Sequence, residues 1–592
     1  MCGIIGYVGN KNSIAQIIEG LTSLEYRGYD SSGMSIIKDN KIFTIKEVGK
    51  VEKLKNKINP LRYVSHIGIG HTRWATHGEV TLENTHPHNS TDNRISVVHN
   101  GIIENYLEIK EELLAKNVSF IGKTDTEVIV KYLEKIYDGN PLDSIYKLSK
   151  RIKGSYALAI LFLDYPNSIF FLKKDSPLLI GYNKNEVYLS SDYTSISDKI
   201  DNIVYLKDNQ YGYIQNDDIR VYIDRKPVKY KIEKTNFTYH STNENKYSTY
   251  LEKEINETSL VAKSIISRYV KNNKIDFSSH SFIHILPYIS HINILGCGSS
   301  YNVGLIGKYL FESLSGISTS VSIASEYKYS NKIHFENTMN ILISQSGETA
   351  DLISCIPYLN KYKLGIINVR NSTISSLCDD NLYLDSGPEI SVATTKAYIG
   401  QLTFLYLLSI QISYSKKKIS SNRYIQLIKE LKAIPGKIQY ILNNHNEIKL
   451  FSNELSNYGN VFFIGRGLDY LTCIEGSLKL KEVTYIHSEA IASGELKHGT
   501  ISLIDPNVYT IALLSSSLKN KTMSNIEEVK SRNGKVFTIS DENSNYVIPK
   551  TIEIFYPLLQ IIPLQLLSLY TGANKKLDID KPRNLAKSVT VE

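Results

Sequence analysis

The chain has 592 residues, 42% of them hydrophobic, enough for about three or four folded domains. Its formal net charge of +8 comes from 68 basic and 60 acidic residues scattered along the chain. No basic run with interleaved aromatic residues is present, so a nucleic-acid partner has little support. Five cysteines without metal-ligand spacing indicate a reducing compartment rather than a disulfide framework.

No secretory signal is expected, because the N-terminus lacks a basic region followed by an apolar stretch. The most apolar stretch, residues 552–570, is interrupted by Glu553, Pro557 and Pro563, which an isolated membrane-spanning helix would tolerate poorly. We therefore expect a cytoplasmic protein without a membrane partner, in which this stretch is buried in a soluble domain.

The first residues place Cys2 where removal of Met1 would make it N-terminal. Its free α-amine, with a reference pKa near ~8, would then serve as a base for its own thiol. The alternative is a small apolar residue at the start of the strand expected over residues 4–8. The role of Cys2 therefore depends on residues further along the chain.

Residues 13–24 carry helical periodicity, and β-prone segments follow at 35–37 and 42–45. Polar clusters separate the elements of this region, at residues 25–33, 71–78, 99–105 and 123–127. Taken singly, each cluster fits an ordinary structural role. Arg73 fits a surface ion pair, Asn100-Gly101 a tight turn and Thr124-Asp125 a helix N-cap.

Together, the clusters resemble the class II glutamine amidotransferase domain, an N-terminal-nucleophile hydrolase of α/β/β/α architecture. The resemblance rests on Met1-Cys2-Gly3-Ile4, Arg27-Gly28-Tyr29-Asp30-Ser31, His71-Thr72-Arg73-Trp74-Ala75-Thr76-His77-Gly78, His99-Asn100-Gly101 and Thr124-Asp125-Thr126-Glu127.

The resemblance implies that Cys2 attacks the side-chain amide of glutamine, forms a γ-glutamyl thioester and releases ammonia. Asn100 and the backbone N–H of Gly101 would form the oxyanion hole. Arg73 would hold the α-carboxylate of glutamine and Asp125 its α-ammonium. The residues that would line or gate this site are Trp74, Thr76 and His77.

Residues 205–230 are expected to form strands that close this first domain, and 234–250 form a polar connector. One helical pattern then covers 249–270. Further on, a short apolar strand, a Gly-x-Gly turn and a helix occur twice, at 292–301 and 461–470. This internal repeat predicts two doubly wound parallel sheets in tandem. Neither turn completes Gly-x-Gly-x-x-Gly, so dinucleotide binding has little support.

Two groups of polar residues in these repeats are candidates for phosphate binding and for proton transfer. After a strand expected over 339–343, the segment Ser344-Gln345-Ser346-Gly347-Glu348-Thr349 opens a helix, and its hydroxyls favour a phosphate site over simple N-capping. Glu475, Lys479 and Glu482 share one helical face, where they form either helix-stabilising ion pairs or a row that moves protons. His498 follows as a further candidate for proton transfer.

The two repeats resemble sugar isomerase (SIS) domains, and the last residues, 580–592, resemble the C-terminal tail of the glucosamine-6-phosphate synthase family. The fold class implied is α/β, an N-terminal-nucleophile hydrolase sandwich followed by two doubly wound SIS domains. The expected domains are a glutaminase domain (1–235), a linker (236–250), two SIS domains (251–435 and 436–578) and a tail that contributes to the sugar site (579–592).

The resemblance implies that ammonia passes through an internal channel to D-fructose 6-phosphate, giving D-glucosamine 6-phosphate and L-glutamate in the first step of amino-sugar (UDP-GlcNAc) synthesis. No metal or organic cofactor is implied, and the family's bacterial enzymes are homodimers. Lys587 would form a Schiff base with the open-chain sugar. His498 would assist ring opening, while Glu482 and Lys479 move protons between C1 and C2. The residues that would hold the sugar phosphate are Ser344, Gln345, Ser346, Thr349, Cys297, Gly298, Ser300, Val392 and Ala586.

Two positions depart from the family's usual residues, Thr500 in place of proline and Thr394 in place of serine, and neither removes a chemical group. Two alternatives stay open. Another amidotransferase, such as the phosphoribosylamine-forming enzyme, would need a diphosphate-binding loop and would lack SIS repeats. A non-catalytic sugar-phosphate sensor would be expected to have lost Cys2, Glu482 or Lys587. The proposed enzyme must begin at Cys2, because Met1 ties up the α-amine.

Overall fold

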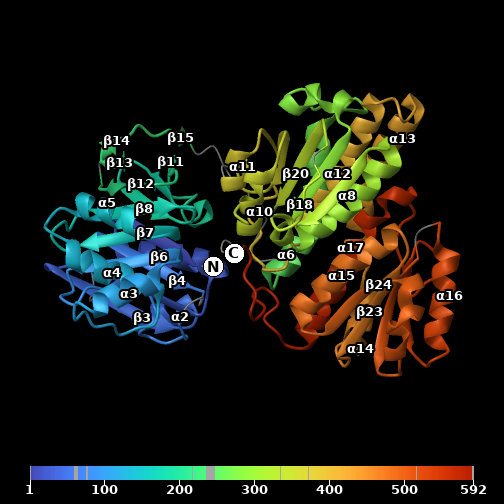
Figure 1. Cartoon of the computed structure of the whole chain (residues 1–592). Helices are drawn as coiled ribbons and strands as arrows, with labels where there is room; N and C mark the ends of the chain where they lie inside the picture. The colour runs from blue at the N-terminus through green and yellow to red at the C-terminus, as the bar shows by residue number, and fades with distance from the viewer. Residues whose placement is uncertain are drawn as a thin grey trace. The chain divides into compact units, whose positions relative to one another are not determined.

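The computed structural model of the chain describes residues 2–58, 64–74, 78–216, 218–234, 247–333, 335–370, 372–514 and 517–589. The chain forms two compact units, residues 1–240 with 588–592 and residues 241–587. Figure 1 colours the chain by residue number, from blue at the N-terminus to red at the C-terminus.

The first unit contains two antiparallel sheets. The strands of the eight-stranded sheet, in order across it, are β15 (Glu233–Lys234), β11 (Asn202–Tyr205), β9 (Leu179–Tyr182), β10 (Glu186–Ser190), β1 (Gly3–Gly9), β4 (Ile67–Arg73), β2 (Ser31–Lys38) and β3 (Lys41–Val48). Those of the seven-stranded sheet are β14 (Lys226–Pro227), β13 (Ile219–Ile223), β12 (Gln210–Ile214), β8 (Ile169–Lys174), β7 (Gly154–Phe162), β6 (Ile95–Ile103) and β5 (His88–Asn89).

Helices cover the outer faces of both sheets, which gives the four layers of the expected α/β/β/α sandwich. Side chains of α1 (Ser13–Leu24) and α2 (Val51–Lys57) pack on the first sheet. Those of α3 (Tyr106–Leu114), α4 (Asp125–Ile136) and α5 (Pro141–Arg151) pack on the second sheet. Between the sheets lies a third apolar cluster contributed by both of them, as expected for sheets that alternate their side chains between faces.

The second unit contains two five-stranded parallel sheets with the same strand order, 2-1-3-4-5 along the chain. The first sheet has the order β19 (Ser318–Ile323), β18 (His291–Gly296), β20 (Thr338–Ser344), β21 (Tyr362–Ile367) and β22 (Asp380–Tyr383). The second has the order β24 (His487–Ala492), β23 (Asn460–Gly465), β25 (Val508–Leu513), β26 (Lys535–Ser540) and β27 (Tyr546–Val547). This repeat confirms the two doubly wound sheets predicted from the sequence.

Long helices fill the space between these two sheets (Figure 1). The pair α8 (Ser299–Ser315) and α12 (Lys396–Ser415) packs against the pair α15 (Leu468–Thr484) and α17 (Tyr556–Asn574). Both α12 and α17 are apolar on nearly every face, which is expected of helices surrounded by other elements. Of the described helices, the one that includes α17 is long and apolar enough to cross a membrane, and 89% of its apolar window is buried in the protein.

The remaining helices of the second unit cover the sheets or connect their strands. The longer ones are α7 (Thr258–Tyr269), α13 (Ser421–Asn443), α14 (Asn446–Leu455) and α16 (Lys519–Lys530). The shorter ones are α6 (Tyr250–Asn256), α9 (Ala324–Tyr327), α10 (Ala350–Cys355) and α11 (Thr373–Leu377). A small hairpin, β16 (Val270–Lys271) and β17 (Lys274–Ile275), follows α7.

Short 3-10 turns complete the chain. They are η1 (Glu25–Arg27), η2 (Tyr193–Ser195), η4 (Ser281–His284), η5 (Leu286–Tyr288), η6 (Ile356–Tyr358), η7 (Ser493–His498), η8 (Thr500–Leu503) and η9 (Glu553–Phe555). Thr500, the departure from the usual proline, begins η8 directly after the segment that carries His498.

The two glycine turns have nearly identical backbones. Gly298 precedes α8 with φ 53° and ψ −127°, and Gly467 precedes α15 with φ 55° and ψ −127°. Side chains rarely tolerate this positive φ, so glycine at both positions has a steric reason. In this strand order a ligand crevice opens where the first and third strands diverge, at the carboxyl ends of β18 and β20. The Cys297 turn and the Ser344 loop therefore lie at the same crevice.

The helical pattern predicted over 249–270 is confirmed as two helices, α6 and α7, separated by a single residue. The chain breaks between α6 and α7 at Glu257, and the hydroxyl of Thr258 donates to the carbonyl of Ile255 at 2.6 Å. A threonine hydroxyl that takes a backbone carbonyl in this way competes with the regular helical hydrogen bond. The connector predicted over 234–250 lies mostly outside the described residues.

Candidate active sites

Cys2 directly precedes β1, a strand in the middle of the first sheet. Its Sγ accepts a hydrogen bond from the backbone N–H of Trp74 at 3.3 Å and lies 3.6 Å from the Trp74 carbonyl oxygen. Burial raises the pKa of the Cys2 thiol, whereas the Trp74 amide and the Arg73 guanidinium lower it. With Met1 attached the thiol is therefore a weak nucleophile, and activation requires a nearby base.

Asn100 and Gly101 lie beside Cys2, as predicted. The Nδ2 of Asn100 donates to the Cys2 carbonyl oxygen at 3.0 Å, although the two residues are 98 positions apart. Gly101 has φ 126°, and a Cβ atom there would lie 2.0 Å from the Ser155 carbonyl oxygen. Glycine thus allows β6 and β7 to approach closely and leaves the backbone next to Asn100 open.

His71 fixes the orientation of the Asn100 amide. Its Nε2 lies 2.9 Å from the His99 carbonyl oxygen and 3.1 Å from Oδ1 of Asn100. Because both neighbours are acceptors, Nε2 must carry the proton. If the Asn100 amide were rotated by 180°, its NH2 group would face the Nε2–H of His71, and two donors would meet. The NH2 group is therefore held toward Cys2.

A stack of buried histidines supports this arrangement. The His71 and His86 rings are stacked with centroids 4.1 Å apart, and His88 meets His86 edge-on at 4.9 Å. Burial, opposed in part by the hydrogen bond to His99, lowers the pKa of His71 to about 3, and burial also lowers those of His86 and His88 well below the ordinary value. These rings are therefore neutral at physiological pH.

Arg73 and Asp125, the predicted clamp for an amino acid, are both buried and both close enough to affect the Cys2 pKa. Arg73 donates to the carbonyl oxygens of Gly78 at 3.1 Å and Glu79 at 3.2 Å. Asp125 accepts from the N–H of Ile103 at 2.9 Å. A buried cation and a buried anion close to the same thiol match the two charges of a free amino acid.

The remaining predicted residues of this site are placed only in part. Trp74 is half-buried and meets the Tyr29 ring edge-on at 5.7 Å. Thr76 and His77 lie outside the described residues. Thr124 caps α4 by accepting from the N–H of Glu127 at 3.2 Å, so the expected N-cap is confirmed.

In the second unit, Lys587 lies in a buried ion pair. Its Nζ is 2.6 Å from Oε2 of Glu389 and 3.4 Å from the hydroxyl of Thr394, and the two charged side chains are 2% and 0% exposed. Burial alone would raise the pKa of Glu389, but Lys587 and the N–H groups of Thr395 and Ala397 hold it below the ordinary value. Glu389 is therefore an ionised carboxylate that holds the Lys587 amine at a fixed position.

The predicted row on α15 is confirmed as one helical face, on which Glu475 and Lys479 are buried and Glu482 is partly exposed. Lys479 lies 2.7 Å from Glu482 and 3.4 Å from Glu475, and its Nζ donates to the Ser299 hydroxyl at 3.0 Å. Burial lowers the pKa of Lys479, but Glu482 and Glu475 outweigh it and raise the pKa to about 12. The charge of Glu389 also raises the pKa of Lys479, so the row on α15 and the Lys587–Glu389 pair are close enough to interact electrostatically.

The loop after β20 has the hydroxyl-rich form expected of a phosphate site. The hydroxyls of Ser344 and Thr349 are 3.0 Å apart, and Ser344 Oγ accepts from the N–H of Gly347 at 3.0 Å. Ser346 Oγ accepts from the N–H of Glu348 at 3.2 Å. Gln345 and Ser346 are only half-buried.

The other predicted sugar-site residues are placed as follows. Cys297 and Gly298 form the turn after β18, and Ser300 donates to Oε1 of Gln401 at 3.3 Å. The N–H of Val392 donates to the Asp580 carbonyl oxygen at 2.9 Å, which ties the 390s segment to the tail that carries Ala586 and Lys587. His498 ends η7 and is exposed, and within the described part of the chain it makes no hydrogen bond.

Two partners of the candidate residues were not recognised from the sequence. Glu389 precedes a polar stretch without a motif, and its contact with Lys587 joins residues 198 positions apart. His71 belongs to a recognised cluster, but its contact with Asn100 depends on the packing of β4 against β6, which belong to different sheets. A carboxylate shortly before a long apolar helix was the only available signal for Glu389.

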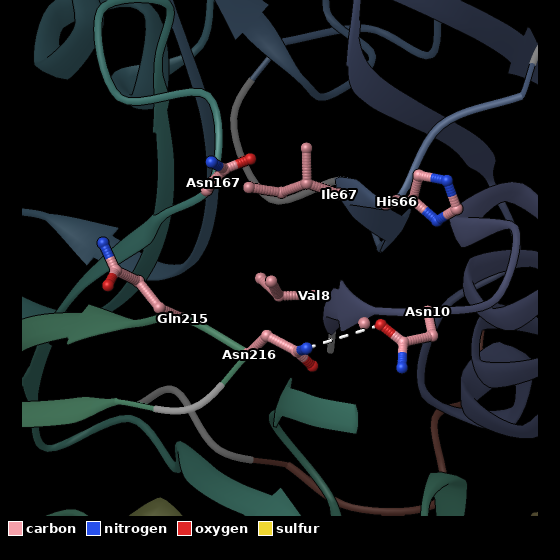
Figure 2. Close-up of a pocket in the computed structure, with 8 residues that line it drawn as sticks. Val8, Asn10, His66, Ile67, Asn167, Gln215 and Asn216 are labelled. Atoms are coloured by element: carbon pink, nitrogen blue, oxygen red, sulfur yellow. Dashed lines mark hydrogen bonds between the residues drawn. The ribbon is translucent and has the colours of Figure 1, made fainter. Parts of the chain in front are cut away.

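A separate cavity of about 440 Å³ lies at the opposite end of β1 from Cys2 (Figure 2). Its lining residues are Val8, Gly9, Asn10, His66, Ile67, Asn167, Gln215 and Asn216. Figure 2 shows Asn10 and Asn216 pointing toward each other, with an N–O distance of 3.4 Å. None of these eight residues belongs to the predicted sites.

Family models match parts of both units. Residues 71–198 match the glutamine amidotransferase domain family, and residues 288–411 and 454–569 match the SIS domain family. The fold and these matches define the chain as a glutamine amidotransferase domain joined to two SIS domains.

Full-length relatives define the family. Proteins named glutamine–fructose-6-phosphate aminotransferase (isomerizing) from Clostridium tetani and Caldanaerobacter subterraneus are 40% identical over 612 residues and 41% identical over 610 residues. Each comparison covers 100% of this chain and 100% of the relative. A solved C-terminal domain of glucosamine-fructose-6-phosphate aminotransferase from Francisella tularensis matches with a TM-score of 0.55 and 34% identity, covering 58% of this chain and 100% of that one. The chain belongs to the glutamine–fructose-6-phosphate aminotransferase (isomerizing) family, which is a family of enzymes.

Proposed function

We propose that this chain transfers the amide nitrogen of L-glutamine to D-fructose 6-phosphate and isomerises the product to D-glucosamine 6-phosphate, releasing L-glutamate. The observation that carries the proposal is the buried contact between Lys587 and Glu389, at 2.6 Å, in a chain that also places Asn100 beside Cys2. An amine held next to a carboxylate suits imine formation, and a cysteine beside amide donors suits acyl transfer.

The glutaminase half begins with the α-amine of Cys2, free after removal of Met1, taking the thiol proton. The thiolate attacks the side-chain carbonyl of glutamine, and Asn100 Nδ2 with the Gly101 N–H stabilises the oxyanion. The α-amine gives its proton to the departing ammonia, which leaves a γ-glutamyl thioester, and water then releases glutamate. Arg73 and Asp125 bind the α-carboxylate and α-ammonium, while Trp74, Thr76 and His77 line the site.

The sugar half begins with binding of the phosphate by Ser344, Gln345, Ser346 and Thr349. His498 assists ring opening, and Glu389 accepts a proton from Lys587. The neutral amine then attacks C2 of the ketose and water leaves, which forms the Schiff base. Ammonia displaces the lysine, and Glu482, assisted by Lys479, moves a proton from C1 to C2 to give the aldose. The residues that complete the pocket are Cys297, Gly298, Ser300, Val392 and Ala586.

The organisation proposed for this activity is a glutaminase domain over 1–235, a linker over 236–250, SIS domains over 251–435 and 436–578, and a tail over 579–592. We further propose a homodimer in the cytoplasm. The five cysteines are all unpaired, which supports a reducing compartment. Size-exclusion chromatography with light scattering tests the dimer directly.

The experiment that tests the function uses purified protein whose first residue is verified as Cys2. With glutamine and fructose 6-phosphate, we expect glutamate and glucosamine 6-phosphate to form in a 1:1 ratio. If enzyme with a free Cys2 forms no glucosamine 6-phosphate, the proposal is wrong. Sugar-phosphate binding without any turnover would favour the sensor.

A further inference from the structure

Helix α6 carries a buried carboxyl, Glu254, that is not among the residues assigned to either half-reaction. The side chain accepts three hydrogen bonds from two consecutive residues, namely from the N–H of Ile390, the N–H of Ser391 at 3.1 Å and the Ser391 hydroxyl. Three donors converging on one buried carboxyl define the position of that backbone closely.

The segment held by Glu254 starts directly after Glu389. On its other side, Glu389 accepts from the N–H groups of Thr395 at 2.9 Å and Ala397 at 3.1 Å, at the start of α12. The Glu389 carboxylate is therefore fixed between Glu254 and the N-terminus of α12. Its remaining strong contact is the Nζ of Lys587 at 2.6 Å.

The opposite end of α6 holds the tail. The Asp580 carboxylate accepts from the N–H groups of Tyr250 at 3.0 Å and Leu251 at 2.7 Å, and the Asp580 carbonyl accepts from Val392. One short helix thus touches both the segment that carries Glu389 and the tail that carries Lys587. Rigid support of this kind sets the geometry of a reacting pair.

The charges around Glu254 fit a supporting role. Burial and the nearby Glu389 raise the pKa of Glu254 to about 8, against the opposing effects of Lys587 and Lys396. Lys396 itself pairs with Glu257 at 2.6 Å. At neutral pH the negative charge therefore resides mainly on Glu389, the carboxyl that contacts the amine.

We propose that Glu254 is a positioning residue for Lys587, acting through the 389–391 segment to hold Glu389 against the lysine amine. The inference rests on the proposed function, because it takes Lys587 as the imine-forming residue. Glu254 itself does not touch the sugar. Its loss should slow imine formation more than it weakens sugar binding.

The test compares Glu254→Ala and Glu254→Gln with the wild-type enzyme and with the control Glu252→Gln, which removes a carboxylate of the same helix that accepts from Ser248. Borohydride reduction in the presence of fructose 6-phosphate traps the Lys587 imine as a secondary amine, detected by mass spectrometry. We expect Glu254→Ala to lower the trapping rate and kcat for synthesis by roughly tenfold or more, with the KM for fructose 6-phosphate changed less than about threefold. Glu254→Gln should recover part of this loss, and the control should match wild type.

Ser391→Ala removes the hydroxyl that binds Glu254 and provides a second, milder variant if Glu254→Ala does not fold. It should show the same kcat-selective loss, and Glu254→Gln combined with Glu389→Gln should be less than additive. Wild-type trapping and kcat in both Glu254→Gln and Ser391→Ala would overturn the inference alone. Absence of an imine in the wild-type enzyme would instead overturn the proposed function.

Discussion

The buried histidines around Cys2 and the ion pairs around Lys587 are two different kinds of polar environment. Beside Cys2 the buried imidazoles are neutral, and the Asn100 amide is oriented by His71 without any change of charge. Around Lys587 lie several ion pairs between largely buried side chains, namely Lys587–Glu389, Lys396–Glu257 and Lys479–Glu482. A thiol that brings its own base needs fixed dipoles, whereas sugar isomerisation needs groups that exchange protons.

The largest expected effects come from substitution of Cys2 or Lys587, and they should distinguish the glutaminase site from the synthesis site. We expect Cys2→Ala to abolish glutaminase activity and glutamine-dependent synthesis, by at least about 10⁴-fold, because the nucleophile is lost. Lys587→Ala should abolish synthesis and leave some glutaminase activity. Parallel assays of glutamate and glucosamine 6-phosphate check this, with Lys581→Ala as the tail control. Loss of all glutamate formation in Lys587→Ala would contradict the division between the two sites.

The next effect concerns the fixed dipole at Cys2. Asn100→Ala removes the donor that lies 3.0 Å from the Cys2 carbonyl oxygen. We expect glutaminase kcat to fall by about 10²- to 10³-fold with a smaller change in the KM for glutamine, because the oxyanion exists only after attack. Steady-state kinetics measure this split. A pure KM effect would place Asn100 in substrate binding instead.

A smaller effect should follow from removing the residue that orients this dipole. His71→Leu deletes the donor to Asn100 Oδ1 and should lower glutaminase kcat by roughly tenfold, whereas His71→Gln, which retains an N–H in that region, should lose less. In a cycle with Asn100→Ala the two losses should not add, because His71 acts through Asn100. Full additivity would show that His71 has an independent role.

The smallest expected effect is on the free energy of unfolding. Its dependence on pH tests whether the buried histidines His71, His86 and His88 are neutral. Between about pH 6.5 and 3 the unfolded chain binds protons that folded His71 does not, so stability falls as pH falls, by up to about 1.4 kcal/mol per pH unit for each such histidine. Urea unfolding followed by Trp74, the single tryptophan, should show a lower midpoint at pH 5.5 than at pH 7. His86→Gln should reduce this dependence, and the exposed His66→Gln should not. A pH-independent midpoint would contradict the account of the His71, His86 and His88 stack.

Much of the fold was predictable because it depends on local signals. The glycine turns at Gly298 and Gly467 and the row Glu475, Lys479 and Glu482 were confirmed where the sequence placed them. The contacts that give these groups their chemistry were not predictable, because they join distant segments without a shared motif. Glu254 meets residues 136 and 137 positions away, and burial of Glu475 and Lys479 follows only from the packing of α8 on α15. The helical pattern over 249–270 does not by itself reveal the one-residue break at Glu257, where the Thr258 hydroxyl donates to the Ile255 carbonyl.

The most direct test of the central claim follows the nitrogen atom from one site to the other. Enzyme beginning at Cys2 is incubated with glutamine labelled with ¹⁵N at the side-chain amide, fructose 6-phosphate and excess unlabelled ammonium, and the sugar is examined by mass spectrometry. The account predicts that the amino group of glucosamine 6-phosphate carries ¹⁵N, in an amount equal to the glutamate formed. Equal glutamate release with unlabelled sugar, or with no amino sugar at all, would contradict it.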